Sequence, residues 1–511
     1  MTASQPAVAP GEGTTLSISL VSHTNVGKTT LARTLLGRDI GAVRDEAHVT
    51  EVAEPHLLLE SADGDRLLLW DTPGFGDSQR LARRLAQAGN PLGWVLTEVW
   101  DRWRDRAFWA SQRAIRHVLG ETDVALYLVN AAEAPEDAGY LASELQVLGL
   151  LGKPVLVLLN QLGPPGSAAA EAQQLQQWQA HLEALAARPG SARVQAVLPL
   201  DALARCWVQE AVLLQAVAAA LPAGQQPAMA RLTAAWAQRQ RHTWQQAMAV
   251  LAQRLARAAL DRELLDGAGW RAPLQRLGAA LGLPVGEADP QARAMATLAG
   301  RLDSDIRHST DALIRLHGLG GQAGAEVLDQ LARHFARREP VSEGRAALWG
   351  GAVAGALAGL KADIATGGLT LGGGLLAGGV LGALGAAGAA HGVNRIRGIT
   401  QPLLAWDDAV LTALLRSALL GYLAVAHHGR GRGDWQPGEP PAAWGEAVDA
   451  ALATQRDAVQ ALWRQRTPWL ADAAVVAAPA DWVAALNDLL SAASADVLKA
   501  LYPQAARSAG L

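Results

Sequence analysis

Cysteine, lysine and charge are all scarce in this sequence. Its 511 residues include one cysteine, Cys206, which excludes an intrachain disulfide and a zinc site built from thiolates. Charged residues make up 18%, the formal net charge is −4, and lysine occurs at four positions only. No basic excess points to a general nucleic-acid binder. Half of the residues are apolar, which excludes a disordered chain, and the length predicts two or three domains.

The N-terminus also lacks the features of a signal peptide. Residues 1–13 have neither a basic segment nor an apolar one, so we expect a flexible N-terminus and a reducing, cytoplasmic setting. The apolar, partly alternating run Thr15–Ser22 that follows predicts a buried strand. A helical pattern begins a few residues later, so the intervening HTNVGKTT lies at a strand-to-helix junction.

This junction has the spacing of a phosphate-binding loop. Ser22 is followed after four residues by Gly27-Lys28-Thr29. Backbone N–H groups of such a loop point at phosphates, the lysine adds a positive charge, and the threonine hydroxyl ligates Mg²⁺. Serine replaces the usual first glycine, at a position that turns tightly but does not touch phosphate.

A second motif, which contains an acidic residue, supports the assignment of the phosphate-binding loop. The strand-like run Arg66–Trp70 ends in Asp71-Thr72-Pro73-Gly74, and an acidic residue in this place holds Mg²⁺, usually through water. The N–H of Gly74 can meet a γ-phosphate. Thr50 lies in the polar loop before the preceding hairpin, where a threonine can close over Mg²⁺ and that phosphate.

Strands and helices alternate through the first 220 residues. Further strands are predicted at 123–130, 153–160 and 193–200, with helices at 137–150 and 168–187. Alternation of this kind predicts an α/β fold with a mostly parallel, doubly wound sheet. We place this domain at residues 14–222 and predict an all-α domain over 223–511, because the strand pattern stops near residue 225.

The motifs HTNVGKTT, WDTPG and LNQ resemble those of translation-factor-related GTPases, and Asn25-Val26-Gly27-Lys28 is most similar to the Era/TrmE/EngA branch. The C-terminal part resembles an uncharacterised helical domain attached to bacterial GTPases. The resemblance implies GTP and GDP as ligands and Mg²⁺ as cofactor, with K⁺ near Asn25. It assigns the nucleotide to Asn25, Val26, Gly27, Lys28, Thr29, Thr30, Asp71 and Gly74, the metal to Thr29, Thr50 and Asp71, and catalysis to Lys28, Thr50 and Gly74.

The base-reading motif departs from this family. The family has N-K-x-D, whereas this chain has Asn160-Gln161-Leu162-Gly163, so the carboxylate that accepts from guanine is missing. Its loss should weaken the preference for GTP over ATP. Asp201-Ala202 matches the Ser-Ala base loop of the family, and as a hypothesis the Asp201 carboxylate supplies the missing acceptor.

Two further departures concern hydrolysis and length. Phe75 stands where many relatives place a glutamine that orients water, so we expect slow hydrolysis that a partner, formation of a homodimer or a cation raises. The stretch 78–122 is longer than a simple switch II segment and is rich in tryptophan and arginine. It predicts a long helix packed on the sheet, with an effector surface coupled to the nucleotide as the alternative.

The most unusual composition lies in residues 346–393. Glycine fills 15 of the 43 positions from 350 to 392, many of them four apart, as in helices that pack closely. One interpretation is a helical hairpin that enters the membrane and binds lipid or a membrane protein. Against it, its first segment has about 15 residues, fewer than the roughly 17–25 that span a bilayer. The other is a hairpin inside a soluble helical domain, followed by a Gly/Arg/Pro-rich linker at 427–441.

The sequence as a whole predicts a GTP-hydrolysing switch whose nucleotide state is coupled to a helical domain. We expect a cytoplasmic protein, peripheral or re-entrant at the inner membrane. A nucleotide-binding scaffold or membrane adaptor with little turnover is the first alternative. A ribosome-associated assembly GTPase is the second, although no RNA-binding module is recognisable.

Overall fold

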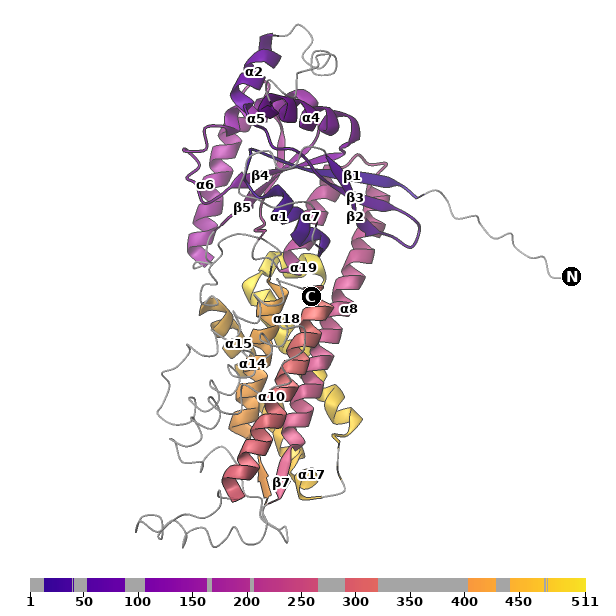
Figure 1. Ribbon diagram of the computed structural model, residues 1–511, viewed down its shortest axis with the longest axis vertical. Helices are drawn as coiled ribbons and strands as arrows, with labels where there is room; N and C mark the ends of the chain where they lie inside the picture. Colours follow the sequence, from indigo (N-terminus) through magenta and orange to yellow (C-terminus); the bar gives the residue numbers. More distant parts are fainter. Residues whose placement is uncertain are drawn as a thin grey trace, which may run out of the picture. The chain divides into compact units, whose positions relative to one another are not determined.

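Figure 1 shows the computed structural model of the chain. Its described residues are 13–38, 40, 53–87, 106–162, 168–202, 206–264, 290–319, 403–428, 442–472, 475 and 477–511. They form two compact units. The first takes the described residues up to 242, together with 427–428 and 502–511, and the second takes those of 243–426 and 442–501.

The first unit is built on a six-stranded sheet with the order β2-β3-β1-β4-β5-β6. Its strands are β1 (Thr15–Ser22), β2 (Glu54–Glu60), β3 (Arg66–Asp71), β4 (Val124–Asn130), β5 (Val155–Asn160) and β6 (Val194–Pro199). Strand β2 runs antiparallel to β3, and every other pair is parallel. The predicted fold class, a mostly parallel sheet with a helical region after it, is confirmed.

Helices cover both faces of this sheet (Figure 1). The helices of the unit are α1 (Lys28–Leu36), α2 (Ser78–Gln87), α4 (Arg106–Glu121), α5 (Leu141–Leu151), α6 (Ala168–Ala186), α7 (Trp207–Ala220), the first part of α8 (Gln226–Leu260) and α19 (Pro503–Ala509). Helices α1 and α7 pack on one face, and α2, α4, α5 and α6 share the core of the other. Glycines in the left-handed conformation end α1 and α5 at Gly37 and Gly152.

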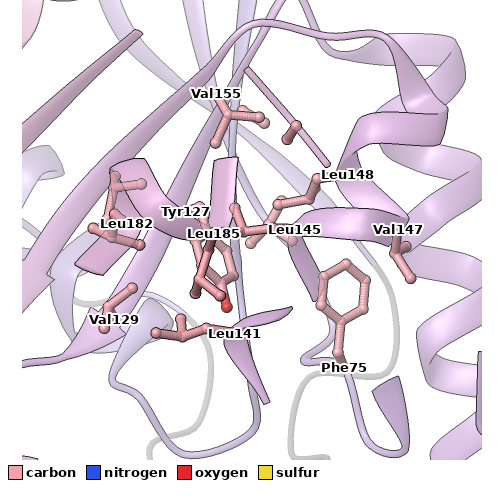
Figure 2. Close-up of a cluster of buried hydrophobic side chains, with 14 of the residues drawn as sticks. Phe75, Tyr127, Val129, Leu141, Leu145, Val147, Leu148, Val155, Leu182 and Leu185 are labelled. Carbon is pink, nitrogen blue, oxygen red and sulfur yellow. The ribbon is translucent and has the colours of Figure 1, made fainter. Parts of the chain in front are cut away.

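The larger core lies under α2, α4, α5 and α6 (Figure 2). Tyr127 and Val129 of β4 enter it from the sheet, and Leu141 and Leu145 of α5 pack over them. All residues of β4 up to Val129 are buried, which explains why this strand reads as a continuous apolar run. Each large side chain buried here stabilises the fold by about 1.5–3 kcal/mol. Helix α5 is therefore firmly held beside the carboxyl ends of the central strands.

The second unit is mainly helical. It contains the later part of α8, then α10 (Pro290–Leu316), α14 (Asp408–Ala426), α15 (Ala442–Thr454), α16 (Arg456–Gln465), α17 (Thr467–Ala471) and α18 (Ala480–Leu501). Helix α14 packs against α10, α15 and α16, and α15 packs against α18. A short antiparallel pair, β7 (Arg262–Leu264) with β8 (Leu403–Ala405), completes the described part.

A buried arginine ties the segments of this unit together. Arg466 donates to the carbonyl of Ala259 at 3.0 Å and to that of Trp406 at 2.7 Å, and it reaches the Asp408 carboxylate at 2.8 Å. Ala259 lies in the last turn of α8, where carbonyls have no partner within the helix. A positive group at that end satisfies the carbonyl and favours the helix dipole.

The prediction that the domain over 223–511 is all-α was wrong at six residues. Residues 262–264 and 403–405 pair as the strands β7 and β8. The two segments are far apart in the chain, and neither has a strand-like alternation of its own. Tertiary pairing therefore overrides their local preference.

Several predicted features lie outside the described residues. These are Thr50, Gly163, the glycine-rich segment 346–393 and the linker from 429 to 441. Within the described part, α14 is the one helix long and apolar enough to cross a membrane, and 67% of its most apolar window is buried. Burial of that kind also fits a core helix of the second unit.

Candidate nucleotide-binding site

The loop between β1 and α1 has the backbone of an anion cradle. Asn25 and Gly27 adopt left-handed conformations, with φ of 64° and 94°. Such turns direct successive N–H groups into one concavity, next to the N-terminus of α1. A Cβ on Gly27 would lie 2.7 Å from Nδ2 of Asn160, so glycine is required here both for its φ angle and for space.

Lys28 is the first residue of α1 and is buried, with 8% of its surface exposed. Its Nζ donates to Oγ of Ser22 at 2.9 Å and to the carbonyl of His23 at 3.2 Å. Ser22, the departure from glycine noted in the sequence, thus provides an acceptor for the lysine. Burial lowers the pKa of Lys28 to about 8, against the attraction of Asp71 and Glu144. A bound anion would favour the charged form further.

Thr29 and Asp71 come together as the metal motif predicts. The Thr29 hydroxyl donates to Oδ2 of Asp71 at 2.6 Å. Oδ1 of Asp71 is buried and has no hydrogen-bond partner in the described part of the chain. Burial raises the pKa of Asp71, while the bond from Thr29 and the charge of Lys28 oppose this shift. Two hard oxygen groups, one of them with an unused buried atom, fit a Mg²⁺ site.

Gly74 lies directly against the loop. A Cβ at this position would be 2.9 Å from Nζ of Lys28 and 3.1 Å from Cα of Thr24. The next residue, Phe75, donates its N–H to the carbonyl of Ser22 at 2.9 Å and has a fully buried ring in the larger core. The ring therefore cannot orient water in the site.

Asn160, at the end of β5, connects the loop to the base motif. Its Nδ2 donates to the carbonyl of Val26 at 2.7 Å, and its Oδ1 accepts from the N–H of Ala202 at 2.8 Å. One buried amide therefore joins the phosphate loop to the segment after β6. Val26 lies 134 positions before Asn160 in the sequence and Ala202 lies 42 positions after it, and the Asn160 side chain brings the two segments together.

Asp201 reaches across to the same motif. Its Oδ2 accepts from the N–H of Leu162 at 2.9 Å, and Gln161 between Asn160 and Leu162 has a left-handed φ of 57°. The carboxylate thus lies beside the backbone that leads to residue 163, where the GTPase family has its aspartate. The hydrogen bonds thus bring the segment Asn160-Gln161-Leu162 next to Asp201-Ala202; that these residues bind the base stays a prediction.

Sequence reasoning assigned no role to three residues beside the phosphate loop: Glu144, His23 and Tyr127. Glu144 is completely buried in α5 and contacts the other two. The signal in the sequence was slight: a single acidic residue in the mostly apolar run LASELQVLGLL. The remaining predicted residues of the loop, from Asn25 to Thr30, all lie around Lys28 or in the first turn of α1.

A family model described as a domain of unknown function, DUF3482, matches residues 186–478, which is more than half of the chain. The chain belongs to the DUF3482 family. A second model, described as a 50S ribosome-binding GTPase, matches residues 17–161. This DUF3482 protein therefore carries a P-loop GTPase domain ahead of its helical domain, as the motifs predicted.

Solved structures with a similar chain include two of Era. One is an Era variant from Aquifex aeolicus bound to GDP and aluminium fluoride, with 20% identity, 41% of this chain and 57% of that chain covered, and a TM-score of 0.29. The other is Era with MgGDPNP and a 16S ribosomal RNA segment, with 20% identity, 41% and 58% covered, and a TM-score of 0.30. The DUF3482 protein thus spans less than two thirds of these chains.

A further similar structure is an oligomerised bacterial dynamin pair. It has 10% identity, covers 96% of the DUF3482 protein and 73% of its own chain, and has a TM-score of 0.24.

Proposed function

We propose that this protein binds GTP and GDP together with Mg²⁺ and hydrolyses GTP slowly, as a nucleotide-dependent switch. The single observation that carries the proposal is the convergence of Lys28, Thr29, Asp71 and Gly74 on one left-handed loop at a helix N-terminus. The match to the GTPase family model over residues 17–161 supports the choice of substrate.

Each residue has a distinct task in this proposal. Lys28 exchanges its bonds to Ser22 and the His23 carbonyl for the β- and γ-phosphate oxygens. Thr29 and Asp71 hold the metal, with Thr50 as the predicted third ligand. When bound, Mg²⁺ neutralises charge that develops on those phosphate oxygens. Gly74 offers its N–H to the γ-phosphate and so detects whether that phosphate is present.

The slow rate follows from Phe75. Its buried ring leaves no polar side chain at the position that orients water in many relatives. We therefore expect an intrinsic rate well below about one turnover per second, as in GTPases that await an activating group. A partner, a homodimer or K⁺ near Asn25 would raise this rate.

Phosphate release from GTP by the full-length protein tests the proposal. We expect slow, Mg²⁺-dependent release by the wild type and none above background by Lys28→Ala. The exposed Lys499 in α18 gives the matched control, since Lys499→Ala removes a lysine of the second unit that belongs to none of the nucleotide motifs. Absence of release by the wild type would favour the nucleotide-binding scaffold, and several turnovers per second would contradict the role of Phe75.

The proposal extends to the base. Guanine presents two donors, its N1–H and its 2-amino group, and needs an acceptor beside them. Asp201, held next to Leu162, is the carboxylate that the described part of the base motif offers. We assign it the task of the missing family aspartate, so that GTP is preferred over ATP.

Replacement of one carboxylate oxygen of Asp201 by an amide nitrogen tests this assignment. Asparagine in Asp201→Asn offers one acceptor and one donor, which match xanthine, whose C2 carries a carbonyl oxygen. We expect the variant to lose affinity for GTP and to gain affinity for XTP, about tenfold each way for a hydrogen-bond pair exchanged. Unchanged GTP and XTP affinities in the folded variant would show that Asp201 does not read the base.

A switch also needs an output, and we propose that the helical domain provides it through residues 346–393. The glycine spacing and the 27 uncharged residues from 364 to 390 support a segment that associates with lipid or with a membrane protein. The description of the GTPase family model as ribosome-binding favours a ribosomal particle as the competing partner.

A further inference from the structure

The GTPase unit has a buried carboxylate that neither its motifs nor its proposed chemistry uses. Glu144 lies in the first turn of α5 and has no exposed surface. An ionised group in such a place is costly unless hydrogen bonds satisfy it. Leu141 and Leu145 beside it belong to the large core, so an apolar residue would be the ordinary choice here.

Two donors satisfy Glu144. Its Oε1 is 2.7 Å from Nδ1 of His23, and its Oε2 accepts from the Tyr127 hydroxyl at 2.7 Å. Because a carboxylate only accepts, Nδ1 of His23 carries the proton. The imidazole also stacks on Tyr140, with the ring centroids 4.7 Å apart and the planes at 19°. The His23 ring is therefore held on its edge by Glu144 and on its face by Tyr140.

The backbone of His23 belongs to the phosphate loop itself. Its carbonyl accepts from Nζ of Lys28 at 3.2 Å, and the residue forms a parallel bridge with Phe75. Ser143, the residue before Glu144, contacts the other side of the site. Its Oγ donates to Oγ of Ser78, the first residue of α2, at 3.2 Å. The first turn of α5 thus contacts both the loop and the segment after Gly74.

We propose that Glu144 is a positioning residue of the phosphate loop: by holding the His23 ring, it fixes the carbonyl to which Lys28 donates and so preorganises the loop for the phosphates of GTP and GDP. This inference rests on the proposed function. In this inference Glu144 acts through His23 and not through a contact of its own with the nucleotide.

The titratable groups around Glu144 and His23 favour the hydrogen bond between them. The groups that face it are Lys28 from α1, Tyr127 from β4, Tyr140 ahead of α5, and Asp71 beyond the lysine. Burial and the neighbouring carboxylate raise the pKa of Tyr127, so its hydroxyl stays a donor to Glu144. The attraction of Glu144 for Lys28 favours the charged lysine that phosphate binding needs.

Equilibrium binding of GTP and GDP to the full-length protein tests the inference with a set of matched variants. We expect Glu144→Gln, which keeps the volume but loses the charge and one acceptor, to weaken both nucleotides about tenfold. The GTP to ATP preference should stay unchanged, because the base group is elsewhere. Tyr127→Phe removes one of the two donors and should have a smaller effect in the same direction.

Conservative replacements at His23 separate positioning from a general loss of packing. His23→Asn keeps a donor at the place of Nδ1 and should bind nearly as the wild type, whereas His23→Leu should resemble Glu144→Gln. The double variant His23→Leu with Glu144→Gln should lose no more affinity than either single variant. Glu210→Gln is the control, since Glu210 is another buried carboxylate, in α7, that accepts from Nε1 of Trp236 at 3.0 Å.

The outcomes are distinguishable. Wild-type affinity in Glu144→Gln, or additive losses in the double variant, would overturn the positioning role. If circular dichroism shows that Glu144→Gln is unfolded, the comparison of His23→Asn with His23→Leu decides, and equal affinities there would overturn it. Failure of the wild type to bind either nucleotide would instead refute the proposed function, and the positioning role of Glu144 would fail with it.

Discussion

Gly74 leaves no room for a methyl group between the DxxG segment and the phosphate loop. A Cβ there would lie 2.9 Å from Nζ of Lys28 and 3.1 Å from both Cα and Cγ2 of Thr24. We predict that Gly74→Ala lowers GTP affinity at least about tenfold, or about 1.4 kcal/mol, because lysine and loop must shift. Gly120→Ala in α4, where a Cβ would meet nothing within 4 Å, is the control. Equal GTP affinity of the two variants would contradict the prediction.

Single residues of the site differ in how far the sequence reveals them. Lys28 and Thr29 are adjacent within a contiguous motif, and Asp71 ends a readable strand, so spacing alone identified them. Glu144 has no motif, because its role comes from a bond to a residue 121 positions away. Asp201 was considered as a base-reading residue only because the aspartate that the family has at residue 163 is missing here.

At the scale of elements, an ion pair with two hydrogen bonds joins the β2–β3 hairpin to α8. Asp65, in the turn, accepts from Arg231 of α8 at 2.7 and 2.9 Å and also from the N–H of Thr14 and the hydroxyl of Ser61. This hairpin joins the Thr50 loop to Asp71. These bonds hold the turn of the hairpin against the first part of α8.

We predict that Arg231→Ala lowers the melting temperature more than Arg66→Ala, which breaks an exposed pair with Glu60 on the same hairpin. Asp65 is 1% exposed, and Arg231 holds its pKa at about 2, below the ordinary value of 3.8. A depressed carboxyl pKa stabilises the fold above about pH 4 and loses this effect as the pH falls toward 2.

Thermal melts of the wild type and both variants between pH 2 and pH 7 test the predicted contribution of the Asp65–Arg231 ion pair. The difference between wild type and Arg231→Ala should be full near neutral pH and shrink as the pH falls below 4. A difference that stays constant down to pH 2 would mean that the Asp65 charge is not what Arg231 stabilises.

The elements themselves could be predicted where the periodicity is local. The parallel strands of the main sheet were found because buried parallel strands read as apolar runs, and α5 and α6 were found between them. The stretch 78–122, which we predicted as one long helix, contains two helices in its described part, α2 and α4. The pair β7–β8 was missed, since three-residue strands depend on a partner that no local pattern reveals. The predicted boundary at residue 222 stays a prediction; in the structure α7 ends at Ala220 and α8 begins at Gln226.

At the scale of the whole molecule, the proposed output of the switch is binding of the helical domain to a membrane. We predict that the full-length protein floats with vesicles of anionic phospholipid, more in one nucleotide state than in the other, and does not sediment with ribosomes. Arg345, Arg395 and Arg397 flank the glycine-rich segment and would favour anionic headgroups. Co-sedimentation with ribosomes, and none with vesicles, would favour the assembly GTPase instead.

The central claim is that the loop around Lys28 binds guanine nucleotides. Equilibrium titration of fluorescent GTP, GDP and ATP into the full-length protein with Mg²⁺, beside Lys28→Ala, tests it most directly. The account predicts binding of GTP and GDP, much weaker binding of ATP, and loss of all binding in the variant. Equal binding of ATP would contradict the role of Asp201, and binding that persists in Lys28→Ala would contradict the site itself.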